Sequence, residues 1–193
     1  MTRICVFCGS SAGFRPAYAE AARALGAELA RRGIGLVYGG GRAGLMGEAA
    51  DAALAGGGEV IGVITRQLEV LERGHTGLTE QRVVETMHER KAMMAELSAG
   101  FVALAGGYGT FEELCEMITW TQLAIHAKPL VVVNTAGYYD PLLAQFDRAL
   151  EEGFLRPQHR AQVVSVTEPA AALDAIAAWK PPTIEKWIDP PRP

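Results

Sequence analysis

The sequence predicts an α/β protein, in which helices cover both faces of a doubly wound parallel sheet. Short runs of β-branched apolar residues alternate along the chain with longer segments of helical pattern, which is typical of such a sheet. Glycine-rich or serine-rich turns follow three of the apolar runs, where strands would lead into helices. With 193 residues, 49% of them hydrophobic and 21% charged, the chain can bury one sizeable core. We therefore expect a single Rossmann-like domain with three layers, α/β/α.

Six or seven segments are predicted to form strands, depending on whether residues 82–84 are included. The predicted strands are 4–7, 36–38, 60–64, 82–84, 101–104, 130–134 and 163–166. Helical patterns lie between them, and the clearest are 16–32, 110–126 and 139–152. The first of these helices is rich in alanine and leucine, has arginines near its end, and is followed by Gly33, which suits a C-cap.

The end of the chain differs from the rest in composition. Residues 181–193 contain five prolines, which remove hydrogen-bond donors and fix φ, so this segment cannot be regular helix or central strand. We expect the Rossmann-like domain to cover residues 1–180 and an extended tail to cover 181–193. Trp187 could anchor this tail on the same subunit or on a neighbour, and a loosely held terminus is the alternative.

Charge and hydropathy exclude some classes of function. The net charge of −4 argues against binding of nucleic acid by general attraction to phosphate. Only Met1-Thr2-Arg3 precedes the first apolar run, which is too short for a signal peptide, and no apolar run approaches the roughly 20 residues that span a bilayer. We expect a cytoplasmic protein without membrane contact.

The cysteines and histidines do not predict a redox or metal site. Cys5 and Cys8 form a C-x-x-C, but residues three apart in a strand face opposite sides of the sheet. We expect both to be buried core thiols, and Cys115, alone on a helix, to be buried as well. His88 has no partner at metal-ligand spacing and the other histidines are scattered, so we expect no metal.

The three turns after strands predict a ligand pocket. They cover residues 8–11, 39–47 and 106–110. In a parallel sheet all three lie at the carboxyl edge, where doubly wound sheets bind their ligands. We expect Ser10 and Gly41 to line a nucleotide-sized pocket there. Tight βα connections also need glycine for geometry alone, so one such turn would carry little weight.

The second turn contains a dinucleotide fingerprint, Gly39-x-Gly41-x-x-Gly44, so an NAD(P)-dependent oxidoreductase is an alternative. The context argues against it. The acidic residue about twenty positions on, Glu59, precedes strand 60–64 and would lie at the opposite edge of the sheet.

The third turn predicts an anion site. Residues 101–105 form an apolar strand that leads through Gly106 and Gly107 into a helix, whose first N–H groups would point at an anion such as phosphate. Glu113 places a carboxylate beside this site. Its alternative role is structural, because Thr110 and Glu113 also have the spacing of a capping box.

A second segment, residues 87–97, supports a catalytic role for Glu113. If the segment is helical, Arg90 lies on or beside its apolar face. The apolar residues of that face are Met87, Met93, Met94 and Leu97. A charge there normally needs a partner or a ligand. The alternative is that Arg90 and Lys91 extend along the surface into solvent.

These segments resemble the LOG ("lonely guy") family, which are cytokinin riboside 5′-monophosphate phosphoribohydrolases. The family's PGGxGTxxE and MHxRK-type motifs match residues 105–113 and 87–91, with Ala105 in place of the proline. The resemblance covers nearly the whole chain, including the turns at 8–11 and 39–47. Members often carry a "lysine decarboxylase" label, but no residue here suggests a lysine that binds pyridoxal phosphate, and we reject that activity.

The resemblance implies a set of roles for these residues. Arg90 and Glu113 would carry catalysis, and the resemblance implies that the substrate is held by Met87, Lys91, Gly106, Gly107, Tyr108, Gly109, Thr110 and Thr119. The expected reaction is hydrolysis of AMP or an N6-substituted AMP to the free base and ribose 5-phosphate, with no metal or redox cofactor. Family members are homodimers or larger, so we expect at least a homodimer.

Physical chemistry agrees with the two catalytic roles. A carboxylate can stabilise the oxocarbenium charge that develops on ribose and can orient or deprotonate water. We expect the helix N-terminus and Arg90 to lower the pKa of Glu113 and keep it ionised. The alternative from another class is a nucleotide or cofactor carrier of the same fold, which has no need of a carboxylate beside a phosphate.

Overall fold

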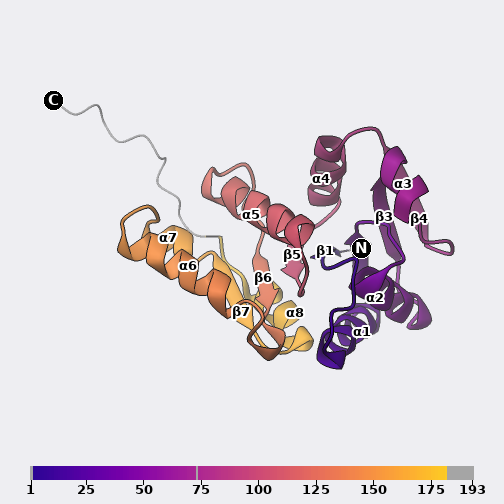
Figure 1. Cartoon of the computed structure of the whole chain (residues 1–193), viewed down its shortest axis with the longest axis horizontal. Helices are drawn as coiled ribbons and strands as arrows, with labels where there is room; N and C mark the ends of the chain where they lie inside the picture. Colours follow the sequence, from indigo (N-terminus) through magenta and orange to yellow (C-terminus); the bar gives the residue numbers. More distant parts are fainter. Residues whose placement is uncertain (1, 73, 182–193) are drawn as a thin grey trace.

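One sheet of seven parallel strands forms the centre of the molecule. The computed structural model describes residues 2–72 and 74–181, and its strands run in the order β4-β3-β2-β1-β5-β6-β7 (Figure 1). The strands are β1 (Arg3–Phe7), β2 (Gly35–Tyr38), β3 (Val60–Thr65), β4 (Glu80–Val84), β5 (Gly100–Ala103), β6 (Leu130–Val133) and β7 (Val163–Val166). Every predicted strand is confirmed, including 82–84, and the doubly wound parallel sheet is confirmed with them.

Helices connect successive strands. They are α1 (Pro16–Arg31), α2 (Gly44–Ala55), α3 (Arg66–Glu72), α4 (Met87–Glu96), α5 (Tyr108–Gln122), α6 (Asp140–Glu151), α7 (Pro157–Arg160) and α8 (Pro169–Ala178), and a 3-10 turn covers Thr135–Gly137. Proline at the start of α1 supplies a φ already suited to a helix, and Gly33 follows its C-cap with φ of +66°. The prediction of 110–126 was shifted, because α5 starts two residues earlier and ends at Gln122.

The two faces of the sheet bury two apolar clusters, so the three-layer arrangement is confirmed. Ile4 and Val6 of β1 point to the side covered by α1, α2 and α8, whereas Cys5 and Phe7 point to the side of α4, α5 and α6. This is the two-residue period of a strand that is buried on both faces. Figure 1 shows α4 and α5 on one side of the sheet and α1 and α2 on the other.

The cysteines follow the prediction in two of three cases. Cys5 and Cys8 are buried in opposite clusters, and desolvation raises the pKa of both thiols. Cys115 is exposed, so the prediction that it belongs to the core was wrong. Its neighbours Leu114 and Met117 supply the apolar face of α5 instead.

Two findings concern the ends of the chain and membranes. Of the proline-rich segment 181–193, only Pro181 belongs to the described residues, so Trp187 lies outside them and the predicted domain boundary stays a prediction. Within residues 2–72 and 74–181, no helix is long and apolar enough to cross a bilayer.

Candidate active site

A pocket of about 260 Å³ opens at the carboxyl edge of the sheet, beside the ends of β1 and β5. The strand order reverses between these two strands, which is where doubly wound sheets bind ligands. The pocket is lined by Cys8, Gly9, Ser10, Met46, Leu68, Met87, Arg90, Gly107, Tyr108, Gly109, Thr110 and Glu113. A second cavity of about 230 Å³ shares Gly9, Ser10 and Gly107 with it. The predicted pocket at this edge is therefore present.

The three predicted turns meet in this region through backbone contacts. The Gly9 N–H donates to the Ala105 carbonyl at 3.0 Å, and the Leu45 N–H donates to the Gly9 carbonyl at 3.0 Å. A Cβ on Gly44 would overlap the backbone of Ser10, and one on Gly106 would overlap the side chain of Thr110. Glycine is needed here because the turns approach one another so closely.

The N-terminus of α5 forms one wall of the pocket. Gly107 is the N-cap, and the first helical hydrogen bond runs from the Phe111 N–H to the Gly107 carbonyl at 3.0 Å. The N–H groups of Tyr108, Gly109 and Thr110 consequently have no carbonyl partner within the helix, and all three residues line the pocket. This arrangement suits an anion such as a phosphate group.

The capping box predicted for Thr110 and Glu113 does not form. Thr110 lies inside the first turn of α5, and the N-cap residue Gly107 has no side chain to accept a hydrogen bond. A capping box occurs instead at the start of α4, where Thr86 and Glu89 exchange bonds between side chain and backbone. The capping-box interpretation of Glu113 is therefore wrong, and its carboxylate has a different partner.

That partner is Arg90, which α4 carries into the interior. Its side chain is 9% exposed, its Nη1 donates to Glu113 Oε1 at 3.0 Å, and its Nε donates to the Val63 carbonyl at 2.9 Å. A longer bond of 3.4 Å joins Nη2 to the Gly39 carbonyl. A Cβ on Gly39 would overlap this guanidinium, so the glycine of the second turn makes room for Arg90. The prediction that Arg90 needs a partner is confirmed, and the surface alternative is wrong.

Glu113 is also nearly inaccessible, with a side chain 10% exposed. Burial raises its pKa to about 7, and the positive charge of Arg90 offsets only part of this rise. The predicted lowering of this pKa was wrong, because Glu113 lies in the second turn of α5, beyond the free N–H groups, and desolvation dominates. A carboxyl group that titrates near neutral pH is suited to proton transfer.

Not every predicted residue reaches the pocket. Ser10, Met87 and Gly107 to Thr110 line it, and Gly106 lines the adjoining cavity. Gly41 instead pairs through its backbone with Gly74 and is not among the lining residues. Its position one residue beyond Gly40, whose φ is +77°, turns it away toward the loop that follows α3.

Lys91 and Thr119 also lie outside the pocket. The Lys91 side chain is 8% exposed and its ammonium contacts Glu112 and Glu116 of α5. Thr119 donates to the Cys115 carbonyl at 2.8 Å and lines a separate groove between α5, α6 and α7. Within this chain, neither side chain reaches the anion site that the family resemblance implies for it.

Two tyrosines that the sequence did not predict as site residues hold the third turn. The Tyr139 hydroxyl donates to the Leu104 carbonyl at 2.6 Å, and the Tyr138 hydroxyl donates to the Gly106 carbonyl. Both follow β6, the strand next to β5, so their signal was two aromatic residues just beyond a strand end. These bonds fix the peptide groups that lead into the N-terminus of α5.

The described residues provide neither a dinucleotide ribose site at Glu59 nor a metal site. Glu59, the acidic residue considered for a dinucleotide ribose, pairs with Arg3 Nε at 2.7 Å at the amino end of the sheet, as predicted. The oxidoreductase alternative thus lacks its ribose carboxylate. Among the described residues, no group of three or more His, Cys, Asp or Glu side chains gathers in a way that could hold a metal ion.

Similarity to known proteins covers most of the chain. A family model described as possible lysine decarboxylase matches residues 46–176. A probable cytokinin riboside 5′-monophosphate phosphoribohydrolase of Oryza sativa subsp. japonica is 55% identical over 163 residues, which cover 84% of this chain and 73% of the rice protein. A cytokinin riboside 5′-monophosphate phosphoribohydrolase of Arabidopsis thaliana is 54% identical over 165 residues, which cover 84% and 76%.

The fold is also found among solved structures. The molybdenum cofactor binding protein of Rippkaea orientalis superposes with a TM-score of 0.70 at 21% identity, covering 92% of this chain and 96% of that one. At this level of identity the likeness shows the shared fold alone.

Proposed function

This chain belongs to the LOG family of cytokinin riboside 5′-monophosphate phosphoribohydrolases, and we propose that it hydrolyses the N-glycosidic bond of AMP or an N6-substituted AMP. Water adds to C1′ of the ribose, the bond from C1′ to the purine nitrogen breaks, and the products are the free base and ribose 5-phosphate. The observation that carries this proposal is the buried Arg90 and Glu113 pair, which lines the same pocket as the N-terminus of α5.

The phosphate is the part of the substrate that the site is best built to hold. The free N–H groups of Tyr108, Gly109 and Thr110 offer donors, and the helix dipole favours a negative charge. Apolar side chains in the same pocket, Met46, Leu68 and Met87, offer a surface for the purine. A phosphate fixed at α5 therefore brings the ribose close to Glu113, one turn further along the same helix.

Glu113 and Arg90 would divide the chemistry between them. The ionised Glu113 stabilises the oxocarbenium charge at C1′ and takes a proton from the attacking water. Arg90, bonded to Glu113 and to the carbonyl groups of Val63 and Gly39, holds the carboxylate in one orientation. A pKa of about 7 leaves a substantial ionised fraction of Glu113 at neutral pH.

The carrier alternative is weakened by the same geometry. A carrier that only holds a phosphate gains nothing from a carboxylate in the pocket, because like charges repel. In this chain both Arg90 and Glu113 line the pocket, and Glu113 is kept there at the cost of burial. This arrangement supports hydrolysis over storage.

We further propose that the active form is a homodimer, as expected from the family. Exposed apolar side chains, Leu123 and Ile125 after α5 and Phe154 after α6, support an apolar contact on this part of the surface. Light scattering coupled to gel filtration tests the assembly. The cytoplasmic location stays a prediction from the sequence.

Product analysis tests the activity. AMP and N6-isopentenyl-AMP are incubated with the wild type, with Glu113→Gln and with Glu20→Gln, a matched control at an exposed position of α1. We expect free base and ribose 5-phosphate from the wild type and the control but not from Glu113→Gln. Nucleotide binding without release of base from either substrate would favour the carrier. The ratio of rates identifies the preferred substrate.

A further inference from the structure

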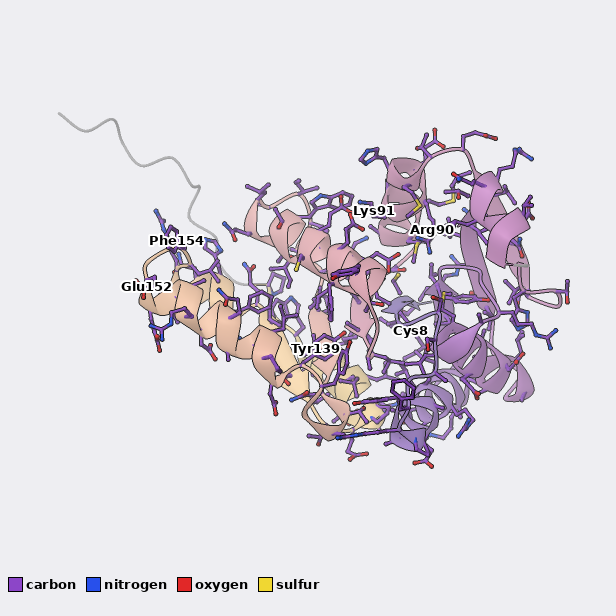
Figure 2. The ribbon with its side chains drawn as sticks, viewed as in Figure 1. Cys8, Arg90, Lys91, Tyr139, Glu152 and Phe154 are labelled. Atoms are coloured by element: carbon purple, nitrogen blue, oxygen red, sulfur yellow. The ribbon has the colours of Figure 1, made fainter. Side chains whose placement is uncertain are left out.

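Lys91 follows Arg90 in the sequence but points to a different part of the molecule. Arg90 reaches toward β2 and β3, where it meets the Gly39 and Val63 carbonyl groups, whereas Lys91 reaches α5. Figure 2 shows this divergence, with Lys91 between α4 and α5 and Arg90 on the side of β3. One turn of α4 thus presents two buried cations to two sites.

The ammonium of Lys91 lies between two acidic side chains of α5. It donates to Glu112 Oε1 and lies 3.0 Å from Glu116 Oε2, and these glutamates are four residues apart on one face of α5. The Lys91 side chain is 8% exposed, so its charge could not be buried without them. This contact is therefore a link between α4 and α5.

The link joins the two helices that carry the proposed catalytic pair. Glu112 is the residue before Glu113, and Lys91 is the residue after Arg90. The two ion pairs between α4 and α5 are therefore adjacent. A change in the distance between the helices at one ion pair would change the distance at the other. Among the described residues of this chain, Lys91 does not line the pocket, and its Nζ faces the two glutamates instead.

The charges of the link also act on Glu113. The negative charge of Glu112 raises the pKa of Glu113, and the charges of Arg90 and Lys91 on α4 lower it. Besides desolvation, the charge of Glu113 also raises the pKa of two buried thiols near it, Cys5 in β1 and Cys8 directly after β1. The positive charge of Lys91 partly offsets the negative charge of Glu112. It thereby limits the repulsion between Glu112 and Glu113, which would otherwise favour the protonated form of Glu113.

We propose that Lys91 is a positioning residue, which bridges Glu112 and Glu116 to hold α5, and with it Glu113, against Arg90, and that it does not bind the substrate phosphate. This inference rests on the proposed hydrolysis. It reassigns the role that the family resemblance implies for Lys91.

The test is the pH profile of kcat/KM for AMP, together with KM at high pH. We expect Lys91→Met to shift the acid limb upward by about half to one pH unit and to change KM at pH 9 by less than about threefold. Glu112→Gln should shift the limb in the opposite direction, and the double variant should lie near the wild type. Lys91→Arg should restore most of the shift.

Three results decide between the alternatives. A rise of about tenfold or more in KM at every pH, with the limb unmoved, would show that Lys91 binds phosphate and would overturn the inference. If Lys91→Met does not fold, Glu112→Gln alone still decides, because an unmoved limb in that variant contradicts the electrostatic link. Failure of the proposed function is distinguishable, since wild type and Glu20→Gln would then release no base at all.

Discussion

Arg90 Nη1 and Glu113 Oε1 lie 3.0 Å apart in a part of the molecule where both side chains are about nine-tenths buried. The pair joins α4 to α5 at the carboxyl edge of the sheet, where the strand order reverses. Each charge needs the other, because neither can be solvated. The pair nevertheless lines an open pocket, which places a poised carboxylate where a ligand can reach it.

The rate of hydrolysis should rise with pH through neutrality. Burial raises the pKa of Glu113 to about 7, and the proposed mechanism requires the ionised carboxylate of Glu113. The value of kcat/KM should therefore increase about tenfold between pH 5 and pH 6 and level off above pH 8. Initial rates of base release between pH 5 and 9 measure this limb. The control is the matched Glu20→Gln, whose profile should overlay the wild type. A flat profile would show that Glu113 does not titrate in catalysis.

Much of this site follows from the sequence, because it depends on local pattern. The strands, the three turns at one edge and the need of Arg90 for a partner are all set by residue type and spacing. The register of α5 was missed, because Thr110 and Glu113 have the spacing of a capping box whether or not Thr110 is the N-cap. In the structure the turn places Gly107 at that position.

Other features depend on contacts between distant segments. The direction of the pKa shift of Glu113 depends on how much protein covers it, which no spacing reveals. The roles of Arg90 and Lys91 differ because α4 is rotated so that one faces β3 and the other α5. Tyr138 and Tyr139 act on a turn more than thirty residues away in the sequence. Tertiary packing decides each of these.

Stability should also depend on pH through Glu113. Its pKa is raised from about 4.5 to about 7 on folding, so the folded state binds the proton more tightly. The tighter binding of this proton adds to the free energy of unfolding. This contribution of Glu113 is complete below about pH 4.5 and is lost as the pH rises through 7, a change of about 3 kcal/mol. Urea denaturation at pH 5 and pH 8 measures this effect. Between these pH values, the free energy of unfolding of Glu113→Gln should increase relative to that of the wild type by a similar amount.

The pH comparison carries its own control. Glutamine keeps the size of the side chain and an oxygen that can accept from Arg90, so the effect of the substitution at pH 5 measures what is lost apart from charge. Glu20→Gln, with an exposed carboxylate, should show no such difference between the two pH values. An equal effect of Glu113→Gln at both pH values would contradict the raised pKa.

Gly39→Ala should reduce catalysis more than it reduces the stability of the fold. The added Cβ would overlap Arg90 Nη2, so the guanidinium must move away from the Gly39 carbonyl and carry Glu113 with it. We expect kcat to fall by about 100-fold, as is typical when a catalytic group is misplaced by an ångström. Gly109→Ala, whose Cβ meets no atom within 4 Å, is the control for folding. Normal kcat in Gly39→Ala would show that the position of Arg90 is not critical.

A ligand with a phosphate should stabilise the protein more than one without it. In the proposed complex the free N–H groups at the start of α5 hold the phosphate of AMP, and adenosine lacks this group. Glu113→Gln should bind AMP without hydrolysing it. AMP at 100 times its Kd adds about 2.7 kcal/mol to the free energy of unfolding. For a chain of this size that corresponds to a rise in Tm of roughly 5 to 10 °C. Adenosine at the same concentration should raise Tm by only a small part of this. Equal shifts with AMP and adenosine would mean that the base and ribose dominate binding, and that the N-terminus of α5 is not the phosphate site.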